Sequence, residues 1–519
     1  MRVWMQRSAL QLAIVCAVLA AAVPTQAQDG LETRQAVARY RTENASRILR
    51  ELVTLLEIPN VASDEVNIHR NAQHLLGMLA ARGVDARLLQ VDGAPPAVYG
   101  ELRVPGATRT VVFYAHYDGQ PADPQHWQSA PWIPTLRTGS LSTGATTLPL
   151  SALDGAVDAE WRLYARSASD DKSPIVAMLT ALDALRAAGA RPSVNVKFFF
   201  EGEEEAGSAH LEAVLKANAA LLAADLWIFC DGPVHQSGLQ QVVFGVRGVV
   251  GVNLTVYGPR RALHSGHYGN WAPNPAAALA SLLAGMRAPD GRVRVAGFYD
   301  DVRPPRADER AAIREVPPVE AQLLQEFGLA QSEVQGALLL DRILEPALNV
   351  RGLASGAVGS ASRNAIPTEA SGSIDFRLVP AQDPRRVQQQ VEAHWTAQGY
   401  HVVHDEPTHT QRRTLPRIVQ ARWGSGYPSM RTRLDLPVSR AVVQAVQEAS
   451  ATAVVRVPTL GGSLPLYLFR EILGAPLIVV PMVNHDNNQH APDENLRLQN
   501  LWNGIDMYAN LMARLGEIW

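Results

Sequence analysis

The sequence predicts an α/β protein whose main domain is interrupted by an inserted α+β domain. Apolar runs such as VVFYAH, VKFFFE and LWIFC are typical of buried parallel strands. Helical patterns separate these runs, as expected of βαβ units. After about residue 244 the pattern changes. VRGVVGVNLTVYG and EASGSIDFRLVP alternate apolar and polar residues, which indicates strands with one face in water.

The elements follow in an order that sets the domain limits. We expect a main domain at 28–244, an insert at 245–408 and the rest of the main domain at 409–519, because the α/β pattern returns from about residue 434. At 519 residues the chain is too long for one ordinary core. Predicted helices occupy 29–57, 65–82, 173–188, 275–287, 318–326, 384–398 and 437–452, with strands at 85–91, 97–102 and 400–404, a surface loop at 138–160, and a helix at the C-terminus.

Residues 1–27 have the pattern of a signal peptide. Arg2 and Arg7 flank a short N-terminal segment, and a short apolar run follows it. The small-residue sequence TQA, which ends at Ala27, fits a cleavage site. An uncleaved anchor and lipoprotein cleavage before Cys16 are the alternatives. We therefore expect an exported protein, periplasmic or secreted, with no stable membrane insertion after cleavage. Cys230 would then be the only cysteine, without an intramolecular disulfide, and we expect it to pack as a small core residue.

Composition argues against some classes of partner. The formal net charge is −3, and 19% of the residues are charged. Neither value favours binding to nucleic acid or to an anionic membrane.

Acidic and imidazole groups follow the predicted strands. They are His116 with Asp118, Glu204 with Glu205, and Asp231; the Asp170-Asp171 pair and, late in the chain, His490 are further candidate ligands. The carboxyl ends of parallel strands are where ligands bind in open α/β sheets. Carboxylates gathered there repel one another unless a cation joins them. Nitrogen and oxygen donors without a thiolate favour zinc, manganese or cobalt. Taken singly, each group also fits a structural histidine, a solvated helix start or a surface turn.

A series of motifs resembles one known family. HYDGQP, RSASDDKSP, EGEEEAGS, CDGP, LHSGHYGN, FRLVP, LGGSLP and QHAPDENL are similar, in this order, to motifs of the carnosinase/aminoacylase-type dinuclear metallopeptidases (peptidase family M20), and most of all to their dipeptidase branch. The resemblance covers nearly the whole mature chain. It implies a zinc-exopeptidase-like catalytic domain with a mixed, mainly parallel sheet and an inserted lid domain through which two subunits form a homodimer. It also implies two divalent metal ions per chain, zinc first, with manganese or cobalt as alternatives.

The resemblance also assigns metal ligands. His116, Asp170 and Asp231 would bind one metal, and Asp170, Glu205 and His490 the other. Asp170 would bridge the two, and the peptide bond after it is cis in relatives. His485 is a competitor of His490, but QHAPDENL favours His490.

Further residues receive catalytic and substrate-binding roles from the same resemblance. Asp118 would orient His116, and Glu204 would be the general base. His264, rather than the nearby His267, would stabilise the oxyanion from the partner subunit. Arg377 would bind the substrate carboxylate, although it could simply pair with a neighbouring acid. Lesser substrate contacts would be Asn364, Gly461, Gly462 and Ser463.

Several features depart from the family pattern. Ser167 and Ser173 replace glycines that are usual around the bridging aspartate. Leu460 stands where dipeptidases often have a polar residue, and the stretch 138–160 is longer than expected and could alter access to the site.

We therefore expect an enzyme that hydrolyses dipeptides or short peptides with a free carboxylate. An amidohydrolase acting on N-acyl or N-carbamoyl amino acids is the alternative that shares the same apparatus. A catalytically silent binding protein on the same fold is the alternative from another class.

Overall fold

The computed structural model describes residues 25–519 and divides into two compact units. Unit 1 contains the described residues up to Val242 together with Leu436–Val454 and Val479–Trp519. Unit 2 contains Val243–Asp435 and Val455–Ile478. Most of the predicted signal peptide lies outside the described residues. Its predicted cleavage sequence, residues 25–27, forms the start of a helix. No helix among the described residues is both long and apolar enough to cross a bilayer.

The sheet of unit 1 is mixed, as the sequence predicts. Its central strand β3 lies between β7 and β8 and is parallel to both, whereas β2 joins β7 antiparallel and β1 joins β2 antiparallel. After its first residue, β3 is buried throughout, because strands covered on both faces are apolar on both. The strands are β1 (Asp85–Leu89), β2 (Ala97–Leu102), β3 (Thr110–His116), β7 (Asn195–Glu201) and β8 (Leu226–Phe229). The chain passes between the units four times, within β9 (Gln241–Val243), after Asp435, after Val454 and within β20 (Leu477–Val479).

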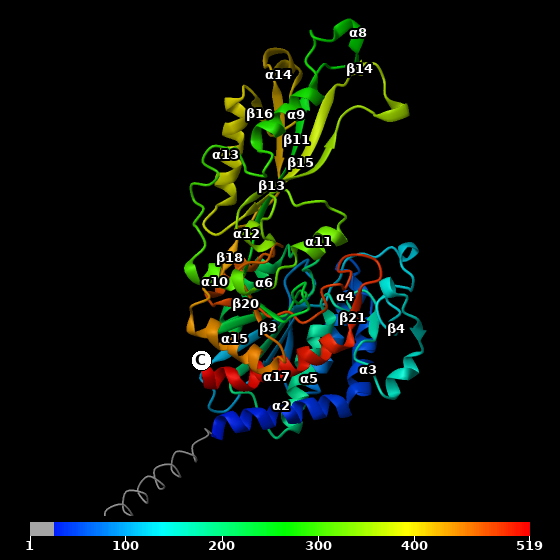
Figure 1. Cartoon of the computed structure of the whole chain (residues 1–519), viewed down its shortest axis with the longest axis vertical. Coiled ribbons are helices and arrows are strands. Elements are labelled where there is room, and N and C mark those ends of the chain that lie inside the picture. The colour runs from blue at the N-terminus through cyan, green and yellow to red at the C-terminus, as the bar shows by residue number, and fades with distance from the viewer. Residues whose placement is uncertain (1–24) are drawn as a thin grey trace, which may run out of the picture. The chain divides into compact units, whose positions relative to one another are not determined.

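Helix α5 (Lys172–Ala187) forms the centre of the helical layer of unit 1. It packs against α17, α2 and α3, and Figure 1 shows α5 beside α17. Its first ten residues are all buried, which requires a helix that is apolar nearly all round. The segment directly before α5 is thereby held on a rigid base. The other helices are α2 (Thr25–Glu43), α3 (Ala45–Leu56), α4 (Glu65–Ala80), α6 (Leu211–Ala217), α7 (Ala219–Leu222), α15 (Pro437–Ala449) and α17 (Leu498–Ile518).

A small second sheet flanks the loop predicted at 138–160, and only its strand β5 lies within that loop. Its strand order is β21-β6-β4-β5, and two short 3-10 helices, Leu141–Thr143 and Leu150–Asp154, complete this region. The pairing of β6 with β21 brings the segment before α5 next to the segment after His490. The strands are β4 (Thr135–Arg137), β5 (Thr147–Leu148), β6 (Arg162–Tyr164) and β21 (Asn495–Arg497).

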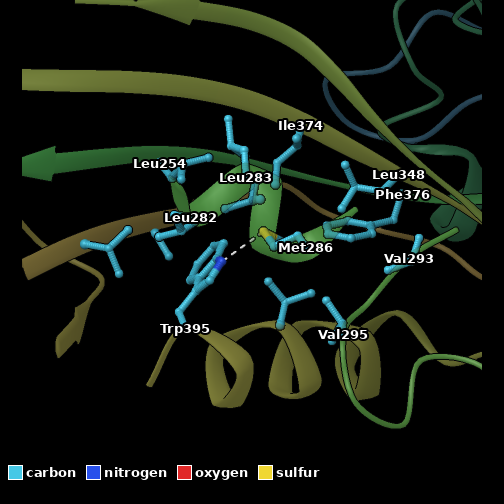
Figure 2. Packing of buried hydrophobic residues seen from close by; sticks show 14 of the residues in the cluster. Leu254, Leu282, Leu283, Met286, Val293, Val295, Leu348, Ile374, Phe376 and Trp395 are labelled. Carbon is cyan, nitrogen blue, oxygen red and sulfur yellow. Dashed lines mark hydrogen bonds between the residues drawn. The ribbon is translucent and has the colours of Figure 1, made fainter. Parts of the chain in front are cut away.

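Unit 2 contains a five-stranded sheet in the order β13-β15-β11-β17-β16. Buried and more accessible residues alternate along β11, which confirms the pattern seen in the sequence. The core includes Trp395, whose Nε1 donates to Met286 Sδ at 3.1 Å, and Figure 2 shows Phe376 and Ile374 among its members. The strands are β11 (Gly248–Tyr257), β13 (Ala347–Ala354), β15 (Glu369–Leu378), β16 (His401–Val403) and β17 (Ile418–Trp423).

Smaller elements complete unit 2. Two short ribbons pair β10 with β18 and β12 with β14. The elements are β10 (Gly245–Val246), β12 (Leu263–His264), β14 (Ala365–Ile366), β18 (Met430–Arg431), β19 (Val455–Val457), α8 (Ser265–Tyr268), α9 (Pro275–Met286), α10 (Ala307–Glu315), α11 (Glu320–Glu326), α12 (Leu339–Ile343), α13 (Pro384–Ala397), α14 (His409–Thr414) and α16 (Leu466–Leu473).

Unit 2 extends beyond the insert expected from the sequence. The expected limit was residue 408, whereas the unit also takes up residues 409–435 and 455–478. The reason is strand β17, which pairs antiparallel with β11 in the middle of the sheet. Long-range pairing of this kind leaves little trace in local sequence patterns.

Candidate metal centre

Three buried side chains of unit 1 form a first group of possible ligands. His116 ends β3, Asp231 follows β8, and Asp170 lies in the turn before α5. One donor atom from each lies within 4.8 Å of the others. The His116 imidazole is fully buried, and its Nε2 lies 2.8 Å from Asp170 Oδ1. The two sheet strands and the helix therefore deliver one nitrogen and two carboxylates to one point.

A second group shares Asp170 with the first. Here the donor atoms of Asp170, Glu205 and His490 lie within 4.8 Å of one another. His490 Nε2 is 3.1 Å from Asp170 Oδ2 and 3.2 Å from Glu205 Oε2. The two oxygens of Asp170 thus face two different histidines. The peptide bond from Asp170 to Asp171 is cis, as the family resemblance led us to expect.

Asp118 connects the first histidine to the turn that carries Glu204 and Glu205. Its two carboxylate oxygens accept hydrogen bonds from Glu204 N (3.1 Å) and Glu205 N (3.0 Å). His116 Nδ1 lies 3.2 Å from the Asp118 carbonyl oxygen and 3.5 Å from its Oδ1. A contact on Nδ1 fixes the ring so that Nε2 faces Asp170. Asp118 therefore acts on the orientation of both segments.

Glu204 lies beside the first group of possible metal ligands but belongs to neither of the two groups. Its Oε2 is 3.9 Å from His116 Nε2. Burial raises the pKa of Glu204 well above its usual range, and the charges of Asp231 and Asp170 raise it further. This is the environment in which a carboxyl group can accept and release a proton near neutral pH.

The electrostatics of the cluster fit bound cations. Burial, reinforced by Asp170, raises the pKa of Asp231 to about 7. Hydrogen bonds to Asp170 and Glu205 raise the pKa of His490 to about 10. Crowded carboxylates therefore bind protons where a cation would relieve their repulsion. Nitrogen and oxygen donors without sulfur suit a divalent metal of the zinc, manganese or cobalt kind.

Metal binding to the group that contains His490 is expected to weaken by about 100-fold between pH 8 and pH 6, and binding to the group that contains Asp231 is expected to weaken as well, because each displaced proton costs roughly tenfold in affinity per pH unit. A ligand must be deprotonated to bind. His490, with its pKa raised to about 10, holds a proton over this whole range, and Asp231, with a pKa of about 7, gains one toward its lower end. Calorimetric titration in two buffers of different ionisation enthalpy measures both the affinity and the protons released. An affinity that does not change with pH would contradict these assignments.

The predicted substrate residues lie in unit 2 and form two clusters. In the first, β12 pairs with β14, and Ser265 N donates to the Asn364 carbonyl at 2.9 Å. His264 is exposed at the end of β12, and its ring lies 4.4 Å from that of His267, centroid to centroid. Among the described residues, neither His267 nor His485 belongs to a group of possible metal ligands.

The second cluster brings Arg377 to the 461–463 loop. Arg377 donates to Asp375 Oδ2 (2.8 Å) and to Ser463 Oγ (2.9 Å). The pairing with a neighbouring acid, the simpler alternative for Arg377, is therefore present as well. Arg247, which was not predicted from the sequence, also contacts this loop. Its Nε donates to the Gly461 carbonyl at 3.0 Å, and its backbone N–H donates to the Gly462 carbonyl at 3.1 Å. Burial, and then Arg377, lower the pKa of Arg247 to about 10. An arginine inside the apolar VRGVVGV run was the available signal.

Comparison with known proteins identifies the class to which this fold and site belong. An α/β unit that presents two adjoining sets of nitrogen and oxygen donors is typical of a metal-dependent hydrolase. The model of peptidase family M20/M25/M40 matches residues 112–514. The chain therefore belongs to this family and is a metallopeptidase.

Named relatives span most of the chain. It is 26% identical over 449 residues to the Cys-Gly metallodipeptidase dug1 of Schizosaccharomyces pombe, covering 83% of this chain and 85% of that protein. It is 24% identical over 499 residues to the human Beta-Ala-His dipeptidase, covering 90% of each. The solved structure of the M20 family metallo-carboxypeptidase Sso-CP2 from Sulfolobus solfataricus is similar, with a TM-score of 0.72, 27% identity, and coverage of 90% of this chain and 99% of that one.

The comparisons correct the predicted location. The sequence led us to expect an exported protein, periplasmic or secreted. That prediction is wrong, because similar proteins such as the Cys-Gly metallodipeptidases of Schizosaccharomyces pombe and Saccharomyces cerevisiae are cytosolic enzymes. The apolar pattern on which the prediction depended ends at about residue 23, outside the described part of the chain.

Proposed function

We propose that the protein hydrolyses the peptide bond of dipeptides or short peptides with a free carboxylate, with two divalent metal ions, zinc first, as cofactors. The observation that carries this proposal is the shared Asp170, whose two oxygens each face a separate group of donors. The relatives named as dipeptidases support the substrate class.

Each residue of the two groups has a definite part in this proposal. His116, Asp170 and Asp231 would hold one metal ion, and Asp170, Glu205 and His490 the other. Two bound ions would supply a water of lowered pKa and would polarise the carbonyl that is cleaved. Glu204 Oε2 takes a proton from the attacking water and later gives it to the leaving amine. Its raised pKa suits both transfers, and Asp118 holds the Glu204 backbone in place.

Substrate recognition is assigned to unit 2 on the family resemblance. Arg377, with Ser463 Oγ hydrogen-bonded beside it, would bind the substrate carboxylate, with Gly461 and Gly462 as backbone contacts. His264 of the partner subunit would stabilise the oxyanion, with Asn364 next to it. This part of the proposal requires a homodimer formed through the inserted lid domain expected at 245–408.

A side-by-side assay tests the substrate class. The full chain, supplied with zinc, manganese or cobalt, is given dipeptides and the N-acetyl and N-carbamoyl derivatives of the same C-terminal amino acids. We expect kcat/KM for the dipeptides to be higher by about tenfold or more, or ~1.4 kcal/mol of transition-state free energy, and to vanish with a chelator. Faster cleavage of the derivatives would favour the amidohydrolase instead. No chelator-sensitive hydrolysis of any substrate would favour a silent binding protein.

A further inference from the structure

A single buried carboxylate, that of Glu494, holds the loop that carries Asp170. Its Oε2 accepts from Arg166 Nη1 (2.8 Å) and Ser167 N (3.0 Å). Its Oε1 accepts from Ser169 N (3.0 Å), Ser169 Oγ (2.9 Å) and Asp170 N (2.9 Å). The side chain is fully buried. Four N–H groups and the Ser169 hydroxyl donate to it, which favours the ionised carboxylate, whereas burial raises the pKa of Glu494.

The backbone around Glu494 fixes where this carboxylate lies. The next residue begins β21, and Asn495 pairs with Tyr164 of β6. One step further, Ala165 N donates to the Glu494 carbonyl at 3.1 Å. The ladder between the two strands therefore ends at the point where the Asp170 loop begins. The ladder therefore holds the Glu494 backbone beside the loop that its carboxylate contacts.

The loop has a conformation that needs such support. Ser167 adopts φ of 62°, in the left-handed region that residues with a Cβ disfavour. Asn60 Nδ2 donates to Ser167 Oγ at 2.8 Å, which is a second tie on the same residue. His490, four positions before Glu494, also has φ of 62°. Both segments that supply ligands around Asp170 are thus bent and are tied together at Glu494.

We propose that Glu494 is a positioning residue for metal binding, which aims the two oxygens of Asp170 at their separate donor groups and joins this loop to the segment that carries His490. The inference rests on the proposed function, since it concerns the same two donor groups. Glu494 belongs to neither group, and its five hydrogen bonds all go to residues 166–170. It therefore acts on the metal through Asp170 and not by direct contact.

Titration of the metal-free full chain with cobalt(II) chloride tests this role. Glu494→Gln keeps the size of the side chain but replaces one oxygen with an amide N–H₂ group. This group cannot accept, so the hydrogen bonds that the replaced oxygen accepted are lost. We expect cobalt to bind at least one site about 10- to 100-fold more weakly than in the wild type, as is usual when a residue supporting a ligand is lost. The cobalt absorption spectrum should change too, because it reports coordination geometry.

A matched control separates positioning from loss of stability. Asp506 is a part-buried carboxylate of unit 1 that accepts from Arg41 Nε (3.1 Å) and Nη2 (3.0 Å), and within the described part of the chain it has no hydrogen bond to a ligand segment. Asp506→Asn should lower the melting temperature but leave cobalt affinity and spectrum unchanged. If Glu494→Gln binds cobalt with the affinity and spectrum of the wild type, the inference is overturned.

A milder variant decides the question if Glu494→Gln does not fold. Ser169→Ala removes one of the five hydrogen bonds, that from Ser169 Oγ. We expect it to weaken cobalt binding by about two- to tenfold, the usual effect of one hydrogen bond. Unchanged binding in this folded variant would overturn the inference. A wild-type chain that takes up no cobalt at all would instead overturn the proposed function, and the inference with it.

Discussion

Replacing Glu204 by glutamine is expected to lower kcat by about 10²- to 10⁴-fold, the usual contribution of a general acid–base group. The amide cannot accept the proton of the attacking water. Glu204 belongs to neither group of possible ligands, so the metal content of the variant should equal that of the wild type. Steady-state kinetics on a dipeptide, with elemental analysis of the same sample, measures both quantities.

Glu203→Gln is the matched control for this variant. Glu203 lies one residue away in the same EGEEE run, but its carboxylate accepts from His210 N at 3.0 Å and contacts His210 Nδ1 at 2.8 Å. Among the described residues it has no hydrogen bond to a donor group, and its replacement should leave kcat within about threefold of the wild type, since changes away from special contacts usually have small effects. Near-normal turnover in Glu204→Gln, with metal retained, would remove Glu204 from the proposed mechanism.

Much of the candidate site could be predicted from the sequence because its polar groups stand directly after buried strands. His116, Asp231 and the Glu204-Glu205 pair each follow a buried parallel strand. Parallel strands in one sheet end at the same edge, so local patterns were enough to bring these groups together. Asp170 precedes a helix instead, and its place rested on the family resemblance. The α/β fold with an inserted α+β unit was predictable for the same reason, since each element has a local period.

Glu494 and Arg247 could not be predicted from the sequence, because both act through contacts with residues far away in the chain. Glu494 stands 324 positions from Asp170 and contacts its backbone N–H. Arg247 stands 214 positions from Gly461. A side chain that hydrogen-bonds to a distant backbone has no periodic signature in the sequence, since the pairing depends on how strands meet. The extension of unit 2 past residue 408 was missed for this reason too, because β17 is defined by its pairing with β11.

Asp170→Asn is expected to abolish binding of both metal ions, with affinity falling by about 100-fold or more, or roughly 2.7 kcal/mol. Asp170 belongs to both groups, and its two oxygens face His116 and His490. The neutral amide presents no carboxylate oxygen to either group, so both groups lose a charged ligand. Hydrolysis should fall to background. Cobalt titration and elemental analysis after dialysis measure the loss.

Two further variants test whether Asp170→Asn loses both ions because Asp170 belongs to both donor groups. Asp231 belongs to the first group alone, so Asp231→Asn should lose one ion and keep the other. Asp183→Asn is the control for stability, because Asp183 lies in the same α5 helix and pairs with Arg82, at 2.9 Å, away from the donor groups. If Asp170→Asn and Asp231→Asn retain the same number of ions, Asp170 does not bridge two sites. The two donor groups would then have to be regarded as independent.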